Sequence, residues 1–243
     1  KKSDLAIVVV GENPLRYQKS KTCGENIDRM GLELLGTQNQ LVQKIHETGV
    51  PTIVVLVGGR PLSVNWIAQN VQALVQAWEP GSLGGRALAN ILTGKVNPSA
   101  KLPISIPRHS GQIQMIYNHK PSQYFHKYID GPSTPLYPFG FGLSYTRFDY
   151  SGLKLSHAKI SVLDSFTASI ELTNVGNREG TEVVQLYIRD VYSSATRPVK
   201  ELKDFTRVTL KPGEKKTVTF TVTPDKLAYW NRNMQYGVEK GEF

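Results

Sequence analysis

The hydrophobic pattern of this chain changes its period near the middle, and that change limits what the chain can fold into. Up to Pro107, continuous apolar runs such as "LAIVVV" and "TIVVLV" alternate with segments of helical spacing. From Phe148 onward, apolar and polar residues alternate singly, as in "FTASIELTN" and "KKTVTFTV". Apolar runs are typical of buried parallel strands, whereas single alternation is typical of strands with one solvated face. The sequence therefore predicts an α/β domain followed by an all-β domain.

The first region predicts a mostly parallel sheet whose strands alternate with helices. "LAIVVV" and "TIVVLV" are expected to be covered on both faces, "NWIAQNVQALVQAW" ends as a third strand, and "KLPISIP" closes the unit as a short strand. Two helices are predicted to end at Gly49 and Gly94. Their buried faces are expected to be Leu41, Val42 and Ile45 in the first helix and Ala87, Leu88, Ile91 and Leu92 in the second.

The second region predicts an antiparallel β-sandwich of immunoglobulin or fibronectin type. Between the two regions, "YPFGFGLSYTRF" reads as a docking segment, because Gly140 and Gly142 let the backbone pass close to another surface. We expect a domain at 1–118, a wrapping linker at 119–146 and the sandwich at 147–243, with its last strand beyond Phe243.

Composition excludes several classes of function. The chain has 243 residues, enough for two domains, with 40% apolar residues and a net charge of +9. The positive charge is spread over both halves without a run of basic residues, which argues against nucleic-acid binding. No stretch approaches the roughly 20 apolar residues of a membrane span, so no membrane insertion is expected. The single cysteine, Cys23, excludes an intrachain disulfide.

Both ends read as cuts through folded material, because "KKSDLAIVVV" leads straight into a strand without a signal peptide and "YGVEKGEF" approaches another. We therefore expect a segment of a longer protein. The phosphate-loop reading of "GGRP" and "GSLGG" lacks the required spacing, and tight backbone approach explains those glycines better. The histidines are too scattered for a zinc site, and no G-x-S-x-G elbow occurs.

Two carboxylates near the end of the first strand are the candidate functional groups. Ligands of open α/β sheets bind at the carboxyl ends of strands. Glu12 lies at the end of the first strand, and Glu25 lies in the long loop that follows. Glu12 could instead bond nearby backbone amides, Glu25 could be a solvated loop residue, and Asp28 with Arg29 could form a salt bridge that shapes the loop. Spacing alone leaves these alternatives open.

Several motifs together resemble one family. "VVVGE", "GENIDR", "WEPGSLGG", "NPSAKLPISIPR", "YPFGFGLSYTRF" and "PVKELKDFTRVTLKPGE" are similar, in order, to the C-terminal half of glycoside hydrolase family 3 enzymes, with bacterial periplasmic β-glucosidases the nearest likeness. The resemblance implies an α/β sandwich domain and a fibronectin type III-like domain. It also implies an N-terminal (β/α)₈ barrel, which is absent from this chain.

The resemblance implies roles for particular residues. Family members cleave β-glycosides with retention, using an Asp nucleophile on the barrel and a Glu acid/base on a loop of the α/β domain. "GENIDR" matches the family's G-E-G-x-D-R stretch, with Asn26 where the family often has Gly, so the acid/base is expected to be Glu25, with Glu12 as the fallback. A +1 subsite is expected to include Arg16, Tyr17, Asp28 and Arg29. No metal or other cofactor is implied.

The implied substrate is a β-linked gluco-oligosaccharide or β-glucoside, and the implied partner is the barrel of the same enzyme. Because no "SDW" nucleophile motif occurs here, the chain alone is expected to be inactive. Periplasmic or secreted localisation is implied, and a homodimer is left open. The alternatives are a β-xylosidase or N-acetylglucosaminidase of the same family, or a non-catalytic carbohydrate-binding or scaffolding segment. An acid at position 25 favours an enzyme, because a decayed site has no reason to keep it.

Overall fold

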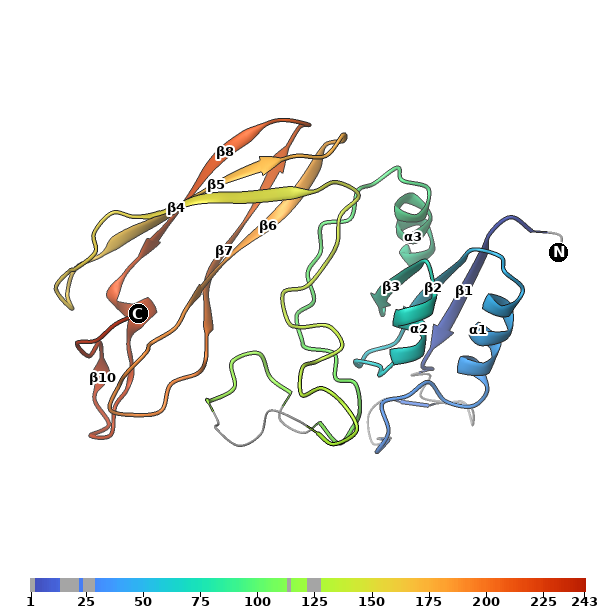
Figure 1. The fold of residues 1–243 in the computed structure, drawn as a ribbon, viewed down its shortest axis with the longest axis horizontal. Helices are drawn as coiled ribbons and strands as arrows, with labels where there is room; N and C mark the ends of the chain where they lie inside the picture. The colour runs from blue at the N-terminus through green and yellow to red at the C-terminus, as the bar shows by residue number, and fades with distance from the viewer. Residues whose placement is uncertain (1–2, 14–21, 24–28, 113–114, 122–127) are drawn as a thin grey trace. The chain divides into compact units, whose positions relative to one another are not determined.

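The computed structural model divides the chain into two compact units (Figure 1) and describes all residues except 1–2, 14–21, 24–28, 113–114 and 122–127. Unit 1 comprises Lys1–Thr93, Ile104–Met115 and Ile129–Phe139, and unit 2 comprises Gly94–Pro103, Ile116–Tyr128 and Gly140–Phe243. Each unit thus combines stretches that are distant in the sequence. The division at 1–118, 119–146 and 147–243 stays a prediction.

Unit 1 is built on a parallel sheet, as predicted. Its strands are β1 (Ala6–Gly11), β2 (Thr52–Val57) and β3 (Ala73–Trp78), in the order β1-β2-β3. β1 pairs with β2 in register from Ala6 opposite Thr52 to Gly11 opposite Val57, so the two strands end side by side. Parallel strands bring their carboxyl ends to one edge of the sheet, where loops can gather functional groups.

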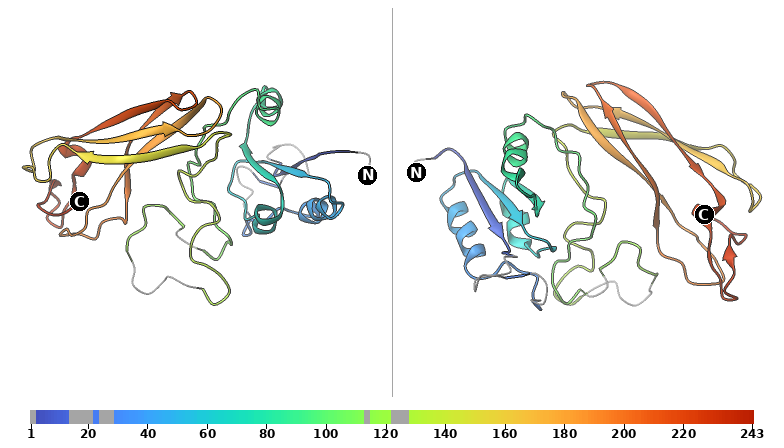
Figure 2. Two further views of the ribbon diagram at one scale, coloured as in Figure 1. Left: turned by 45° about the horizontal axis from the view of Figure 1, so that its top comes forward. Right: turned by 180° about the vertical axis from the view of Figure 1, so that it is seen from behind.

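Among the described residues, the helices that accompany this sheet are α1 (Gln38–Glu47), α2 (Asn65–Asn70) and α3 (Gly84–Leu92). Figure 2 shows α1 and α2 on one face of the sheet and α3 on the other. Both predicted helix ends are confirmed, because Gly49 and Gly94 adopt positive φ angles of 73° and 72° just beyond α1 and α3. The core between the sheet and the first two helices contains Val8, Val10, Leu34, Val42, Val54, Leu56, Leu62, Val64 and Ile67.

The expectation that both apolar strands are covered on both faces holds for β2 and is wrong for β1. Val54, Val55 and Leu56, which point to alternate faces of β2, are all buried. In β1, by contrast, Ile7 is 50% and Val9 61% exposed. β1 is an edge strand of the described sheet, so β2 is flanked on both sides while one face of β1 is only partly covered by the described residues.

The predicted helix faces are right for most positions. Val42 is fully buried and Ile45 packs against the core, but Leu41 is 50% exposed. In α3, Ala87 is exposed while its three predicted companions are partly buried. The prediction that Leu41 and Ala87 are buried is wrong, because α1 and α3 each contact their neighbours along a narrower stripe than the apolar spacing suggests.

The short strand predicted for "KLPISIP" is not formed. Ile106 alone makes an isolated antiparallel bridge, to Tyr137, and its N–H donates to the Tyr137 carbonyl at 2.8 Å. Pro103 and Pro107 flank this stretch and lack the N–H groups that a longer ladder would need. The bridge still joins the two distant stretches within unit 1.

Unit 2 contains the predicted antiparallel sandwich. One sheet has the order β4-β5-β8, and β6 pairs with β7 in the other. The strands are β4 (Phe148–Leu155), β5 (Phe166–Asn174), β6 (Gly180–Ile188), β7 (Glu201–Leu210) and β8 (Lys215–Val222). Their inward residues form one core of Leu172, Val184, Val208, Leu210, Val218 and Phe220. The switch from apolar runs to alternation therefore identified the second fold correctly.

The regular elements that follow β8 in unit 2 are short. They are helix α4 (Pro224–Leu227) and the two-residue strands β9 (Tyr229–Trp230) and β10 (Tyr236–Gly237).

Within the described ranges, no helix combines the length and apolar character that crossing a membrane would require.

The close backbone approach predicted for Gly140 and Gly142 is confirmed within unit 2. A Cβ on Gly142 would lie 2.2 Å from the carbonyl oxygen of Ala100, and one on Gly140 would lie 2.4 Å from the Gln185 side chain. Lys101 adds a polar connection, since its Nζ donates to the Gly142 carbonyl at 2.9 Å and pairs with Glu182 Oε1 at 2.9 Å. Residues 100–101 and 140–142 thus lie against each other and against β6.

We expect Gly142→Ala to destabilise the protein by about 1 to 3 kcal/mol, the usual cost of forcing an atom into a filled site. The obstacle is backbone, so it cannot rotate away. The matched control is Gly85→Ala in α3, where a Cβ meets nothing within 4 Å and helix propensity should raise stability. Urea unfolding checks both variants, and equal stability of the two would contradict the steric argument.

Candidate active-site edge of the parallel sheet

Three charged residues follow the three parallel strands of unit 1. Glu12 comes directly after β1, Arg60 lies three residues beyond β2, and Glu79 comes directly after β3. Because the strands are parallel, these residues share the carboxyl edge of the sheet. Glu12 and Arg60 meet there, with Glu12 Oε2 and Arg60 Nε 3.0 Å apart.

Two glycines make this edge possible. Gly11 has a φ of 148°, and a Cβ there would lie 1.8 Å from the carbonyl oxygen of Val57, so only glycine fits. Gly58 has a φ of 155°, and a Cβ there would touch Glu12 Cβ at 3.3 Å. The chain after β2 therefore passes close over the chain after β1, and the Glu12 side chain is enclosed between them.

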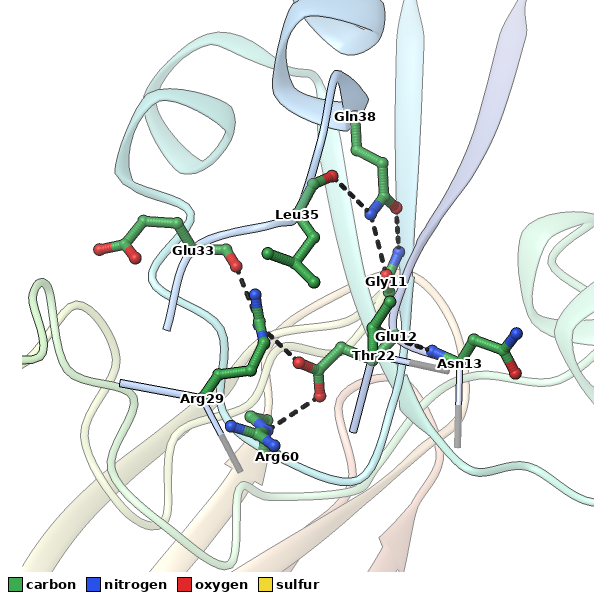
Figure 3. A network of polar contacts seen from close by, with 9 residues as sticks. All are labelled: Gly11, Glu12, Asn13, Thr22, Arg29, Glu33, Leu35, Gln38 and Arg60. Atoms are coloured by element: carbon green, nitrogen blue, oxygen red, sulfur yellow. Dashed lines mark hydrogen bonds and ion pairs between the residues drawn. The ribbon is translucent and has the colours of Figure 1, made fainter. Parts of the chain in front are cut away.

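The Glu12 carboxylate is buried and held by two arginines (Figure 3). Its side chain is 1% exposed, and Oε1 accepts a hydrogen bond from Nη2 of Arg29 at 2.5 Å. Oε2 faces Nε of Arg60 as an ion pair but makes no hydrogen bond among the described residues. A buried carboxylate is stable only when it is paired, so this arrangement depends on both arginines.

Hydrogen bonds connect the end of β1 and the residues just after it to other parts of unit 1. The N–H of Asn13 donates to Thr22 Oγ1 at 2.8 Å, and the N–H of Thr22 donates to the Asn13 carbonyl at 2.8 Å. Gln38, at the start of α1, accepts from the Gly11 N–H at 2.7 Å and donates to its carbonyl at 3.0 Å. Figure 3 shows these contacts beside the Glu12 ion pairs, so residues 11–13 are fixed from several sides.

Cys23 is buried beside this carboxylate, with 5% of its surface exposed. Burial raises the pKa of its thiol, and the neighbouring Glu12 carboxylate raises that pKa further. The thiol is therefore poorly ionised and acts as a packing residue of the loop rather than as a nucleophile.

The structure describes only some of the predicted site residues. Glu25, Arg16, Tyr17 and Asp28 lie outside the described residues, so their roles stay predictions. Arg29 is described, and Nη2 of its guanidinium bonds both Glu12 and the Glu33 carbonyl, the latter at 3.0 Å. These contacts favour a role in shaping the loop over direct contact with a sugar.

The fallback role of Glu12 as the general acid/base also stays a prediction. Both of its oxygens face guanidinium groups, which suits an anchor better than a group that must donate a proton to a substrate. Arg60 was missed by sequence reasoning, because "GGRP" was considered only for its glycines. The available signal was that Arg60 follows β2 as Glu12 follows β1. Among the described residues, no group of three His, Cys, Asp or Glu side chains could hold a metal ion.

The chain thus combines a parallel α/β sheet, whose carboxyl edge carries a buried ion pair, with an antiparallel sandwich. Both parts match known domain families. Residues 1–145 match the glycosyl hydrolase family 3 C-terminal domain, and residues 182–243 match the fibronectin type III-like domain. The chain belongs to glycosyl hydrolase family 3.

Individual relatives agree with this assignment. The chain is 46% identical to a β-xylosidase of Formosa agariphila, with all of this chain and 33% of the relative covered. It is 42% identical to a periplasmic β-glucosidase of Salmonella typhimurium, with all of this chain and 32% of the relative covered. The chain therefore spans about a third of the length of these curated relatives, as expected for a C-terminal portion without the barrel.

Solved structures give the same result. A β-glucosidase from Erythrobacter marinus matches with a TM-score of 0.89 and 40% identity, over 98% of this chain and 32% of that one. A β-glucosidase from Listeria innocua, solved in complex with glucose, matches with a TM-score of 0.88 and 35% identity, over 98% of this chain and 34% of that one.

We expect Glu12→Gln to lower the free energy of unfolding by about 3 to 5 kcal/mol, because it leaves two guanidinium groups without their buried counter-charge. The matched control is Glu47→Gln, which breaks the exposed pair with Lys44 and should cost under about 1 kcal/mol. Urea unfolding of both variants measures the difference. A loss for Glu12→Gln no larger than that of the control would contradict the anchoring role.

We expect Cys23 to ionise at higher pH in the native protein than in the unfolded chain. Its folded pKa is raised, so the protonated thiol is the form that the fold favours, and native stability falls as pH rises past the pKa of the unfolded thiol. The pH dependence of alkylation by iodoacetamide, with and without urea, gives both midpoints. A native midpoint at or below the unfolded one would be inconsistent with this environment.

Proposed function

We propose that the chain is the C-terminal part of a retaining β-glycosidase that hydrolyses terminal, non-reducing β-D-glucosyl residues of oligosaccharides and β-glucosides. The observation that carries the proposal is the carboxyl edge of the unit 1 sheet, where buried Glu12 holds Arg29 at the end of "GENIDR". Such an anchor suits a domain edge that must present a catalytic group. Family membership and relatives named β-glucosidase support the proposal.

In this proposal the chemistry is divided between two parts of the full-length protein. An Asp on the N-terminal barrel attacks the anomeric carbon, while Glu25 protonates the leaving oxygen. Glu25 then removes a proton from the water that hydrolyses the covalent glycosyl-enzyme. Retention requires the two carboxyl groups to be about 5 to 5.5 Å apart. The acid must also keep its proton near working pH, which needs a desolvated setting that the barrel would complete.

A β-xylosidase is the second candidate, because the Formosa agariphila relative with 46% identity carries that name. Glucosides and xylosides differ by one hydroxymethyl group, and a pocket discriminates groups of that size by only about 1 to 3 kcal/mol. Comparing kcat/KM for aryl β-glucoside and aryl β-xyloside in the full-length protein distinguishes the two. Periplasmic or secreted localisation follows by analogy with the Salmonella typhimurium relative.

We expect Glu25→Ala in the full-length protein to lower turnover by about two to four orders of magnitude, the usual contribution of an acid/base. Glycosylation by an aryl glucoside with an acidic phenol should survive, because such a leaving group needs little protonation. The covalent intermediate should then accumulate, since its hydrolysis has lost the base. Azide should restore turnover as β-glucosyl azide, because a small anion can enter the vacated space.

The control for this experiment is Glu12→Ala, which removes the fallback residue. It should reduce stability and give no azide product, because the proposed acid/base remains in place. β-Glucosyl azide from Glu12→Ala but not from Glu25→Ala would transfer the role to Glu12. Near-normal activity in both variants would remove this loop from the chemistry.

A further inference from the structure

We propose that unit 2 carries a sugar-binding site, a small cavity in the connection between β6 and β7 that binds one neutral pyranose unit. The cavity has a volume of about 150 Å³ and is lined by Pro121, residues 189–193 and residues 195–199. All of these residues belong to unit 2. The site therefore stands on this unit alone.

The connection that forms the cavity is held in place by its neighbours in unit 2. The N–H of Val191 donates to the Glu242 carbonyl at 2.9 Å. The N–H and the hydroxyl of Ser194 donate to the two oxygens of the Glu239 carboxylate, at 2.9 and 2.6 Å. A cavity whose walls are already ordered loses little conformational entropy when a ligand binds.

Arg197 supplies a fixed charge at the cavity. The carbon of its guanidinium lies 4.4 Å from the centre of the Tyr229 ring, and Nη2 donates to Glu201 Oε2. Its side chain is 14% exposed. Arg197 therefore has good partners on two sides, in contrast to the acid that it faces.

Asp190 is the polar group of the cavity that is poorly paired. Its side chain is 6% exposed, and Oδ2 lies 3.7 Å from Arg197 Nε, which is too long for a hydrogen bond. The Ser193 hydroxyl can occupy one of the roughly four acceptor positions of a carboxylate. A buried carboxylate normally has its partners supplied by the fold. The remaining acceptor positions of Asp190 thus suit a ligand that donates hydrogen bonds.

The electrostatic setting of Asp190 agrees with this geometry. Burial raises the pKa of its carboxyl, and the Arg197 guanidinium opposes that shift only in part. The carboxylates of Glu239 and Glu201 also raise this pKa. The fold therefore disfavours the charge on Asp190, whereas an acid kept only for stability would be favoured as the carboxylate.

The mixture of charges around the cavity disfavours an ionic ligand. A cation would meet Arg197 and Arg189, and an anion would meet Asp190 with Glu201 behind it. A neutral ligand with several hydroxyl groups avoids both repulsions and can donate to Asp190. The cavity has room for more than one water, each of which needs roughly 10 to 15 Å³, but it is smaller than the roughly 300 Å³ at which drug-sized sites begin.

Apolar walls favour a sugar ring over an open-chain polyol. Pro121, Pro198 and Val199 line the cavity, and Tyr192, 79% exposed, adds an aromatic ring. The C–H face of a pyranose can cover such surfaces while its hydroxyl groups reach Asp190. The choice of a sugar among neutral polyhydroxy compounds rests on the proposed function, which brings glucosyl units to this protein.

The test is hydrogen exchange of the full-length protein, measured by mass spectrometry with and without D-glucose. Glucose should slow the exchange of amides at residues 189–197, and the protection should saturate as glucose is raised. Sorbitol is the matched control ligand, because it carries similar hydroxyl groups without a ring. It should give no saturable protection in this segment.

Variants connect the protection to particular side chains. Asp190→Asn should weaken glucose binding at this segment by about 10-fold or more, because hydrogen bonds to a charged acceptor are the strong ones. Tyr192→Ala should weaken it by about 3- to 10-fold, through the lost apolar contact. The matched controls are Asp149→Asn and Phe205→Ala, which change an exposed acid and an exposed ring elsewhere in unit 2 and should leave binding unaltered.

Melting temperature separates a ligand-binding acid from a structural one. Asp190→Asn should keep or raise it, because the amide removes a charge that the fold disfavours. A lower melting temperature together with unaltered protection by glucose would identify a structural ion pair with Arg197 and overturn the proposal. If Asp190→Asn does not fold, Tyr192→Ala decides, since its side chain is exposed.

Three other results would overturn the sugar-binding site. They are the absence of saturable protection by glucose, equal protection by sorbitol, and protection by calcium chloride or sodium phosphate in place of glucose. Turnover of phenyl β-glucoside is measured in parallel. A wild-type protein without turnover counts against the proposed function, whereas the exchange at residues 189–197 decides the sugar-binding site by itself.

Discussion

The ion pairs of Glu12 are the interaction on which the carboxyl edge of the unit 1 sheet depends. The Glu12 side chain is only 1% exposed, and a carboxylate so deeply buried needs counter-charges. Arg29 and Arg60 supply them from two different loops. Gly11 and Gly58 allow the backbone to close over it. The loops after β1 and β2 are therefore coupled to each other through one buried side chain rather than held separately.

Hydrophobic period was sufficient to predict the fold class, because both sheets bury their residues by simple rules. The runs of β2 and the alternation of β5 and β8 were read correctly from the sequence. The wrong predictions concern an edge strand and a short connecting stretch, where burial and pairing depend on neighbours in space. Ile7 and Val9 look like core residues in the sequence, yet they lie on a face of an edge strand that the described residues cover only in part. "KLPISIP" alternates like a strand, yet its prolines leave a single bridge.

The candidate site was harder to predict for a different reason. A resemblance identifies which residues a family uses, but it does not identify what holds them. Arg29 was expected in a +1 subsite, and that role stays a prediction. What the sequence did not indicate is that its guanidinium bonds Glu12 and a backbone carbonyl. Arg60 was hidden in a glycine-rich turn. Pairing between residues 12, 29 and 60 depends on which strand ends meet in space, and the order of the strands in the sequence indicates this only indirectly.

The divided active site that we propose would give the ion pairs of Glu12 a purpose beyond stability. In an enzyme whose nucleophile lies on a separate barrel, the fold of the barrel cannot set the position of an acid that arrives from another domain. That position must come from the domain that carries the acid. A buried ion pair suits this task, because removing either partner is costly and its geometry is therefore strongly favoured. Apolar packing alone tolerates repacking at lower cost. The polar, buried character of Glu12, Arg29 and Arg60 is thus what the proposed chemistry requires of this edge.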